Sequence, residues 1–86
     1  MPTKKHAADL ILPPNAPFST RLWYIIQKRG LSQREFARMS GLTLTTVSGY
    51  VCGNREPYFG SLVKIAKTLD VSLDWLCGLR DGMEDE

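Results

Sequence analysis

The sequence predicts a small all-α fold of five short helices. Apolar residues recur at helical spacing in several windows, and the first of these windows has Phe18, Leu22, Ile25 and Ile26 along one face. Helix start and stop signals separate the windows, because serine or threonine precedes several of them and glycine follows most of them. The chain shows no strand pattern and no internal repeat. Its 86 residues, 43% of them hydrophobic, suit one globular domain.

An arm formed by residues 1–17 precedes the first helix. Its prolines stop any helix and favour extended backbone. The arm also contains the apolar run Leu10-Ile11-Leu12, which we expect to dock on the first helix of the same chain or of a partner subunit. A disordered arm is the alternative.

The first helix is predicted over about residues 17–29. Asn15 is a candidate cap at its start, and Gly30 marks its end. Trp23 and Tyr24 lie off the apolar stripe of this helix. The pattern therefore predicts that these two aromatic side chains are exposed or covered by a partner.

A capping box marks the start of the second helix. Ser32 is followed three residues later by Glu35, the spacing at which side chain and backbone cap each other. Phe36 and Met39 are three residues apart and are predicted to face one way. Gly41, which tolerates a positive φ, ends the helix near residue 39 or 40.

The third helix follows after a tight turn. Thr43 is positioned to cap it, and Val47, Tyr50 and Val51 fall at helical spacing on its inner side. Gly53 ends it. A short helix, a turn with glycine and a second helix form the helix-turn-helix pattern.

Two further helices complete the prediction. One covers about residues 59–69, and Ser72 caps a last short helix that ends at Gly78. We expect the following side chains of these helices in the core: Leu62, Ile65, Ala66, Leu69, Leu73, Trp75 and Leu76.

The helix-turn-helix stretch and its flanks resemble the lambda-repressor/Cro-like family of helix-turn-helix proteins, also called XRE-type. The matching residues, in order and with unbroken spacing, are Leu31-Ser32-Gln33, Phe36-Ala37, Ser40-Gly41-Leu42-Thr43, Thr46-Val47-Ser48, Gly53-Asn54-Arg55-Glu56-Pro57, Leu62-Val63-Lys64-Ile65-Ala66-Lys67 and Val71-Ser72-Leu73-Asp74-Trp75-Leu76. The resemblance implies a compact five-helix DNA-binding domain. We expect an N-terminal arm at 1–17, this domain at 18–79 and an acidic tail at 80–86.

Charge is segregated along the chain, although the net charge is only +2. Residues 18–79 carry eight Lys/Arg and four acids, whereas residues 80–86 carry one base and four acids. A basic body suits a polyanionic partner such as DNA. An ordinary solvated surface is the alternative explanation.

The sequence indicates no enzyme, metal or cofactor. His6 is the only histidine, and Cys52 and Cys77 have no zinc-ligand spacing, so we expect two buried or half-buried free thiols. No apolar run is long enough to span a membrane, and Leu10-Ile11-Leu12 is too short for a signal-peptide core. We expect a cytoplasmic protein that binds neither a membrane nor a small-molecule substrate.

The predicted interface with double-stranded DNA lies on the second and third helices. The start of the second helix offers free backbone N–H groups to a phosphate, and the third helix would enter the major groove. The resemblance puts Gln33 in contact with the DNA backbone and the third helix, and Leu44, Thr45 and Gly49 at base-reading positions. The predicted DNA-binding residues are Gln33, Arg34, Arg38, Thr43, Leu44, Thr45, Ser48, Gly49, Asn54 and Arg55.

The third helix departs from the usual chemistry of base reading. Residues 43–52 contain no charge and no Asn or Gln, so bidentate contacts to guanine or adenine are missing. Hydroxyl groups, contacts to thymine methyls and DNA shape remain. Gly49 allows a close approach but reads nothing.

Two functions from different classes stay open. One is a sequence-specific transcriptional regulator, repressor-like, that binds a near-palindromic operator as a homodimer. The other is an interaction module on the same fold, such as a toxin-neutralising antitoxin or an adaptor. The arm, the uncharged third helix and three aromatic residues favour the second: Trp23, Tyr24 and Tyr58.

One interior position pair also differs from the family. Members often carry an Arg four residues before the glycine that ends the first helix and a Glu two residues before the glycine that ends the third. Here these residues are Ile26 and Val51. We predict that they touch each other in the core.

Overall fold

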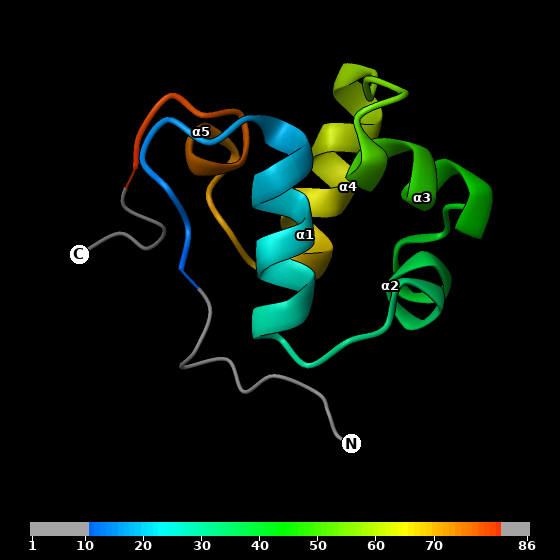
Figure 1. Cartoon of the computed structure of the whole chain (residues 1–86). Helices are drawn as coiled ribbons and strands as arrows, with labels where there is room; N and C mark the ends of the chain where they lie inside the picture. The colour runs from blue at the N-terminus through cyan, green and yellow to red at the C-terminus, as the bar shows by residue number, and fades with distance from the viewer. Residues whose placement is uncertain (1–10, 82–86) are drawn as a thin grey trace.

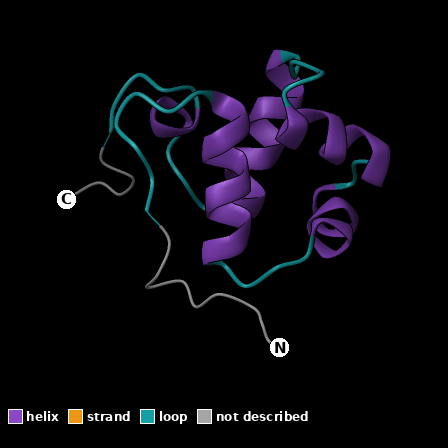
Figure 2. Ribbon diagram, viewed as in Figure 1, coloured by secondary structure: helices purple, strands orange, loops and turns teal. Residues whose placement is uncertain are grey.

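Five helices form the secondary structure of residues 11–81, the part of the chain that the computed structural model describes. They are α1 (Phe18–Lys28), α2 (Gln33–Ser40), α3 (Leu44–Cys52), α4 (Phe59–Leu69) and α5 (Leu73–Leu76) (Figure 1). Figure 2 shows only helices and loops over these residues. The predicted all-α class is therefore confirmed.

The helix α1 stands at the centre of the arrangement. It packs against α3 and α5, while α2 packs against α3 and α4, and α4 packs against α5. The pair α2 and α3 lies on one side of α1, and α5 lies on the other (Figure 1). The second and third helices are thus presented together at one end of the molecule.

The core draws apolar side chains from all five helices. The predicted inner faces are largely confirmed by these buried residues: Leu22, Ile25, Ile26, Phe36, Val47, Tyr50, Ile65, Ala66, Leu69, Trp75 and Leu76. Partly buried apolar side chains pack around them, among them Phe18, Leu62 and Leu73. Helices as short as these five gain most of their stability from such tertiary packing.

The two residues of the unusual interior pair both turn away from solvent. Ile26 is fully buried, and Val51 is half-buried and packs against the core. Since α1 and α3 pack together, the arrangement suits a contact between these side chains. The contact itself stays a prediction.

The predictions for two side chains were wrong. Met39 does not share the inward direction of Phe36, because α2 turns Phe36, Ala37 and Ser40 towards its neighbours and leaves Met39 53% exposed. Tyr24 is buried rather than exposed. Its ring lies 6.3 Å from that of Trp75, because α5 folds back onto this face of α1.

The helix caps follow the sequence closely, with one exception. Ser32 and Glu35 form the predicted capping box, in which the Glu35 N–H donates to Ser32 Oγ at 3.0 Å and the Ser32 N–H donates to Glu35 Oε1 at 2.8 Å. Thr43 and Ser72 cap α3 and α5 by accepting the N–H groups of Thr46 and Trp75, without the reciprocal bond of a capping box. Asn15 does not cap α1, contrary to the prediction. It lies in a turn with a φ of 61°, a conformation that asparagine tolerates better than most residues.

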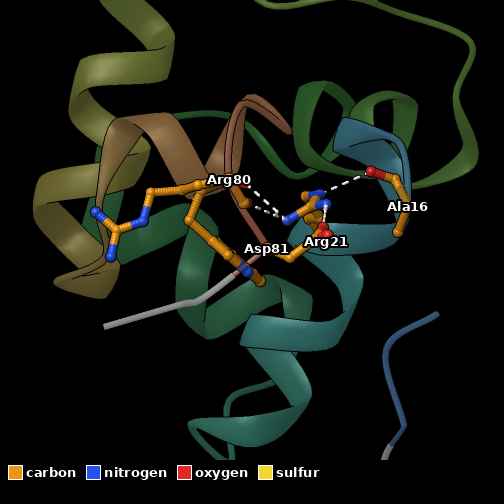
Figure 3. Close-up of polar contacts among 5 residues, drawn as sticks. Ala16, Arg21, Arg80 and Asp81 are labelled. Atoms are coloured by element: carbon orange, nitrogen blue, oxygen red, sulfur yellow. Dashed lines mark hydrogen bonds and ion pairs between the residues drawn. The ribbon is translucent and has the colours of Figure 1, made fainter. Parts of the chain in front are cut away.

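A buried arginine joins both ends of the described chain. Arg21 is completely inaccessible, and its Nε donates to the carbonyl of Ala16 at 2.7 Å (Figure 3). Its Nη1 donates to the carbonyls of Trp75 and Arg80, and its Nη2 forms an ion pair of 2.9 Å with Asp81. Arg21 thereby connects segments on both sides of the domain predicted at 18–79. This cation belongs to the interior and contributes nothing to a basic surface.

The apolar part of the arm packs in part against the core. Leu12 is half-buried there, whereas Ile11 is 85% exposed. Leu10 lies outside the described residues, as do Lys4, Lys5 and His6. Within the described part of the chain, none of the helices has the length and apolar character that crossing a membrane requires.

Candidate nucleic-acid interface

The turn between α2 and α3 sets the geometry of the candidate interface. Gly41 ends α2 with a φ of 76°, which a residue with a side chain adopts only with strain. The chain then passes through Leu42, which packs against the core, to the Thr43 cap. This short connection holds α3 directly against α2.

Gln33 links the two helices at the start of α2. The hydroxyl of Ser48 on α3 donates to Gln33 Oε1 at 3.1 Å. The contact of Gln33 with the third helix, which the family resemblance implies, is therefore present. Because Oε1 accepts this bond, the Nε2 amide group keeps its two donors for another acceptor.

Arg34 and Arg38 place two positive charges on the exposed side of α2. They are four residues apart and so lie on one face of the helix. Neither has a side-chain hydrogen bond or ion pair with another described residue. Both guanidinium groups are therefore available to an anionic partner, Arg34 in the first turn of α2 and Arg38 in its last turn.

The hydroxyl groups of α3 differ in their availability. Thr43 is engaged as the cap and donates to Thr46 Oγ1 at 2.9 Å, and Ser48 is engaged with Gln33. Thr45 is exposed and has no polar partner among the described residues, and Leu44 beside it is half-buried. Thr45 is thus the hydroxyl on this face with the most freedom to meet a base.

The loop after α3 folds back onto the helix. The carbonyl of Gly49 accepts the backbone N–H groups of Asn54, at 2.9 Å, and of Arg55, at 3.2 Å. Arg55 Nη1 also donates to Thr46 Oγ1 at 3.3 Å. Thr46 was not among the predicted site residues. It lies three residues after the Thr43 cap, however, and from that position a side chain can reach the capping residue.

The structure thus brings half of the predicted site residues together in two groups. One group joins Gln33 to Ser48 across the two helices. The other joins Gly49, Asn54 and Arg55 at the far end of α3. Arg34 and Arg38 stand apart from both groups in terms of polar contacts.

The two cysteines do not have the predicted environment. Cys52 lies in the last turn of α3 and Cys77 follows α5, and both thiols are free and exposed. Partial burial, and then the charge of Asp74, raise the pKa of the Cys77 thiol, so it stays protonated at neutral pH. Within residues 11–81, no three His, Cys, Asp or Glu side chains gather as metal ligands do.

Comparisons with known proteins show which family shares these features. A family model described as helix-turn-helix matches residues 24–76. An uncharacterised HTH-type transcriptional regulator of Haemophilus influenzae is 39% identical over 59 residues, which are 69% of this chain and 24% of that protein. The HTH-type regulator YqaE of Bacillus subtilis is 37% identical over 59 residues, which are 51% of its length.

A third relative is the cryptic phage CTXphi transcriptional repressor RstR of Vibrio cholerae. It is 40% identical over 47 residues, which are 55% of this chain and 42% of that protein. The chain therefore spans about a quarter to a half of the length of these curated relatives.

Solved structures show the same arrangement of helices. The restriction-modification controller protein C.AhdI from Aeromonas hydrophila is 34% identical, with a TM-score of 0.66, and the match covers 69% of this chain and 89% of that one. The P22 c2 repressor, solved with a synthetic operator, is 22% identical, with a TM-score of 0.69, and the match covers 72% and 94%. The likeness to the P22 repressor concerns the fold.

Proposed function

The chain belongs to the lambda-repressor/Cro-like, XRE-type family of helix-turn-helix transcriptional regulators, and on this premise we propose that it is itself a sequence-specific DNA-binding regulator of the repressor type. In this proposal α3 enters the major groove, and two copies bind a near-palindromic operator. The half-sites lie about one helical turn apart, on the order of 34 Å. We expect a cytoplasmic location and no catalytic activity.

The observation that carries the proposal is the bond between Gln33 and Ser48. It holds the start of α2 against the outer side of α3, so a phosphate at the α2 N-terminus and a base edge at α3 lie within reach of one rigid unit. We propose a dimer because one small module makes few contacts with DNA, whereas two joined modules bind DNA much more tightly.

Selection from a random DNA library tests this function directly. We expect an enriched inverted repeat, and gel-shift titrations of that repeat at two salt concentrations should show weaker binding at the higher one. If no motif is enriched and binding does not depend on salt, the regulator function is wrong.

Alanine at Arg34 or Arg38 should weaken binding to all DNA sequences alike. Each arginine is exposed on α2 and is proposed to neutralise a phosphate, so its removal should reduce the slope of log affinity against log salt by about one for each phosphate that is no longer neutralised. Titrations at four salt concentrations measure this slope. Lys67→Ala, which removes the same charge from α4 outside the proposed interface, should leave the slope unchanged. An unaltered slope in both arginine variants would remove them from the interface.

Thr45→Ala should change which sequences are preferred rather than how tightly DNA is held in general. The hydroxyl and methyl groups of Thr45 are exposed and without a partner among the described residues, so we expect a loss of about 1 kcal/mol per half-site at one base position. Repeating the library selection with the variant measures this shift. Thr68→Ala on α4 serves as the control, and an identical motif for Thr45→Ala and wild type would exclude Thr45 as a reader.

A protein-binding role is the second candidate function. Tyr58 and Phe59 at the start of α4 are 85% and 70% exposed, and exposed aromatic neighbours are typical of protein contacts. Tyr24 no longer supports this role, since it is buried. The DNA selection described above decides between the two candidates.

A further inference from the structure

The side chain of Arg55 lies across the glycine position in α3. A Cβ atom placed on Gly49 would stand 2.8 Å from Arg55 Cδ and 3.0 Å from Arg55 Cγ. Non-bonded carbon atoms attract best at about 3.5–4.0 Å, so a side chain at this position and the present Arg55 conformation exclude each other. The aliphatic part of Arg55 therefore occupies the volume that the glycine leaves open.

Further contacts hold Arg55 in this place. Its backbone N–H donates to the carbonyl of Gly49, and its Nη1 donates to Thr46 Oγ1, the atom that also accepts a bond from the Thr43 cap. Backbone, aliphatic stem and guanidinium are thus each fixed against α3. Since one bond to Thr46 uses one of five N–H donors, most of the guanidinium remains open to an outside acceptor.

The position of this cation matters because α3 has no charge of its own. Its residues, LTTVSGYVC, include no basic or acidic side chain. Arg55 belongs to the loop that follows α3, and its guanidinium places a positive charge beside this uncharged helix. A guanidinium in this place is suited to a phosphate at the edge of the groove that the helix enters.

We propose that Gly49 is a positioning residue, whose missing side chain seats Arg55 against α3 for contact with a DNA phosphate. This inference rests on the proposed function. It differs from the sequence-based interpretation, in which Gly49 lets the DNA itself approach closely. In the structure Gly49 is half-covered, and Arg55 is the group that lies against it.

A double-mutant cycle separates the two roles of the glycine. Gly49→Ala, Arg55→Ala and the double variant are titrated with the selected DNA over a range of salt concentrations. If Gly49 acts through Arg55, each single variant should lose on the order of tenfold in affinity, with the same reduction in salt slope, and the double variant should bind no more weakly than Arg55→Ala. Gly60→Ala is the matched control, because this exposed glycine in the first turn of α4 has no neighbour within 4 Å of the place that an alanine Cβ would take, and the variant should bind like wild type.

Two outcomes would overturn the inference while leaving the regulator function intact. One is wild-type affinity for Gly49→Ala. The other is a double variant that is weaker than Arg55→Ala by the full factor of the Gly49→Ala change, which would mean that the glycine faces DNA directly.

A measurement without DNA keeps the inference testable if the wild-type protein does not bind DNA and the proposed function fails. Alanine is a better helix former than glycine, so Gly49→Ala should raise the melting temperature when Arg55 is already alanine. In the wild-type background the displaced arginine should reduce or abolish this rise. Equal rises in both backgrounds would overturn the seating of Arg55.

Discussion

Replacing Arg21 by methionine should lower the free energy of unfolding by about 3 kcal/mol or more. Methionine keeps much of the side-chain length but removes the hydrogen bonds that Arg21 donates to the carbonyls of Ala16, Trp75 and Arg80, and hydrogen bonds to a charged group are worth about 1.5–3 kcal/mol each. The guanidinium also lies 5.4 Å from the centre of the Trp75 ring, and methionine cannot replace this attraction between a cation and an aromatic face. Denaturation with urea, followed by circular dichroism, measures the change.

The control for this experiment removes the charge on the other side of the ion pair. Asp81 is 63% exposed in its side chain, so water screens its charge, and asparagine keeps an oxygen that can accept the Arg21 bond. Asp81→Asn should therefore cost less than about 1 kcal/mol. The contrast between the two variants assigns the effect to the contacts of Arg21 with the carbonyls and the Trp75 ring rather than to the ion pair. A decrease below about 1 kcal/mol for Arg21→Met would mean that these hydrogen bonds do not support the fold.

Ile26→Arg should also destabilise the protein by roughly 3 kcal/mol or more. The side chain is fully buried in α1, so the variant places an unpaired charge in the core. Ile26→Met keeps the volume and the apolar character, and it should cost less than about 1.5 kcal/mol. Thermal melts of the two variants provide the comparison, and similar melting temperatures would show that position 26 tolerates a charge.

The double variant Ile26→Arg with Val51→Glu tests the predicted contact between these positions. If the two side chains adjoin, the new acid should pair with the new base and recover part of the stability that Ile26→Arg loses. A double variant that is less stable than Ile26→Arg alone would contradict the contact.

Local signals in the sequence were sufficient for the helix boundaries that a capping residue marks. Ser32, Thr43 and Ser72 each precede a helix that begins at the next residue, and Gly41 and Gly53 follow the helices that they end. A cap needs only the few residues around it, so its chemistry is readable without the rest of the chain. The family resemblance rested on the same spacing, which explains why the fold class was predictable.

The burial of Arg21 could not be predicted from such local signals. It lies three residues after Phe18 and four before Ile25, so its position on the apolar stripe was visible, yet it was counted among the basic charges of the surface. Its burial depends on carbonyl groups of Trp75 and Arg80, more than fifty residues away in the chain. A charge is stable in the interior when such partners are supplied, and periodicity cannot supply them.

The candidate interface was likewise predictable from the sequence only in part, and tertiary structure decided the rest. Sequence alone determined which residues belong to the turn and to the outer side of α3, because a helical period of 3.6 residues assigns each residue to a face. Tertiary structure decided what those residues do to one another. Packing of α3 on α2 brings Ser48 to Gln33, and packing of the following loop on α3 brings Arg55 to Gly49. These contacts depend on how separate segments fit together, and that fit is decided by the whole core, which also turned Met39 outward and Tyr24 inward.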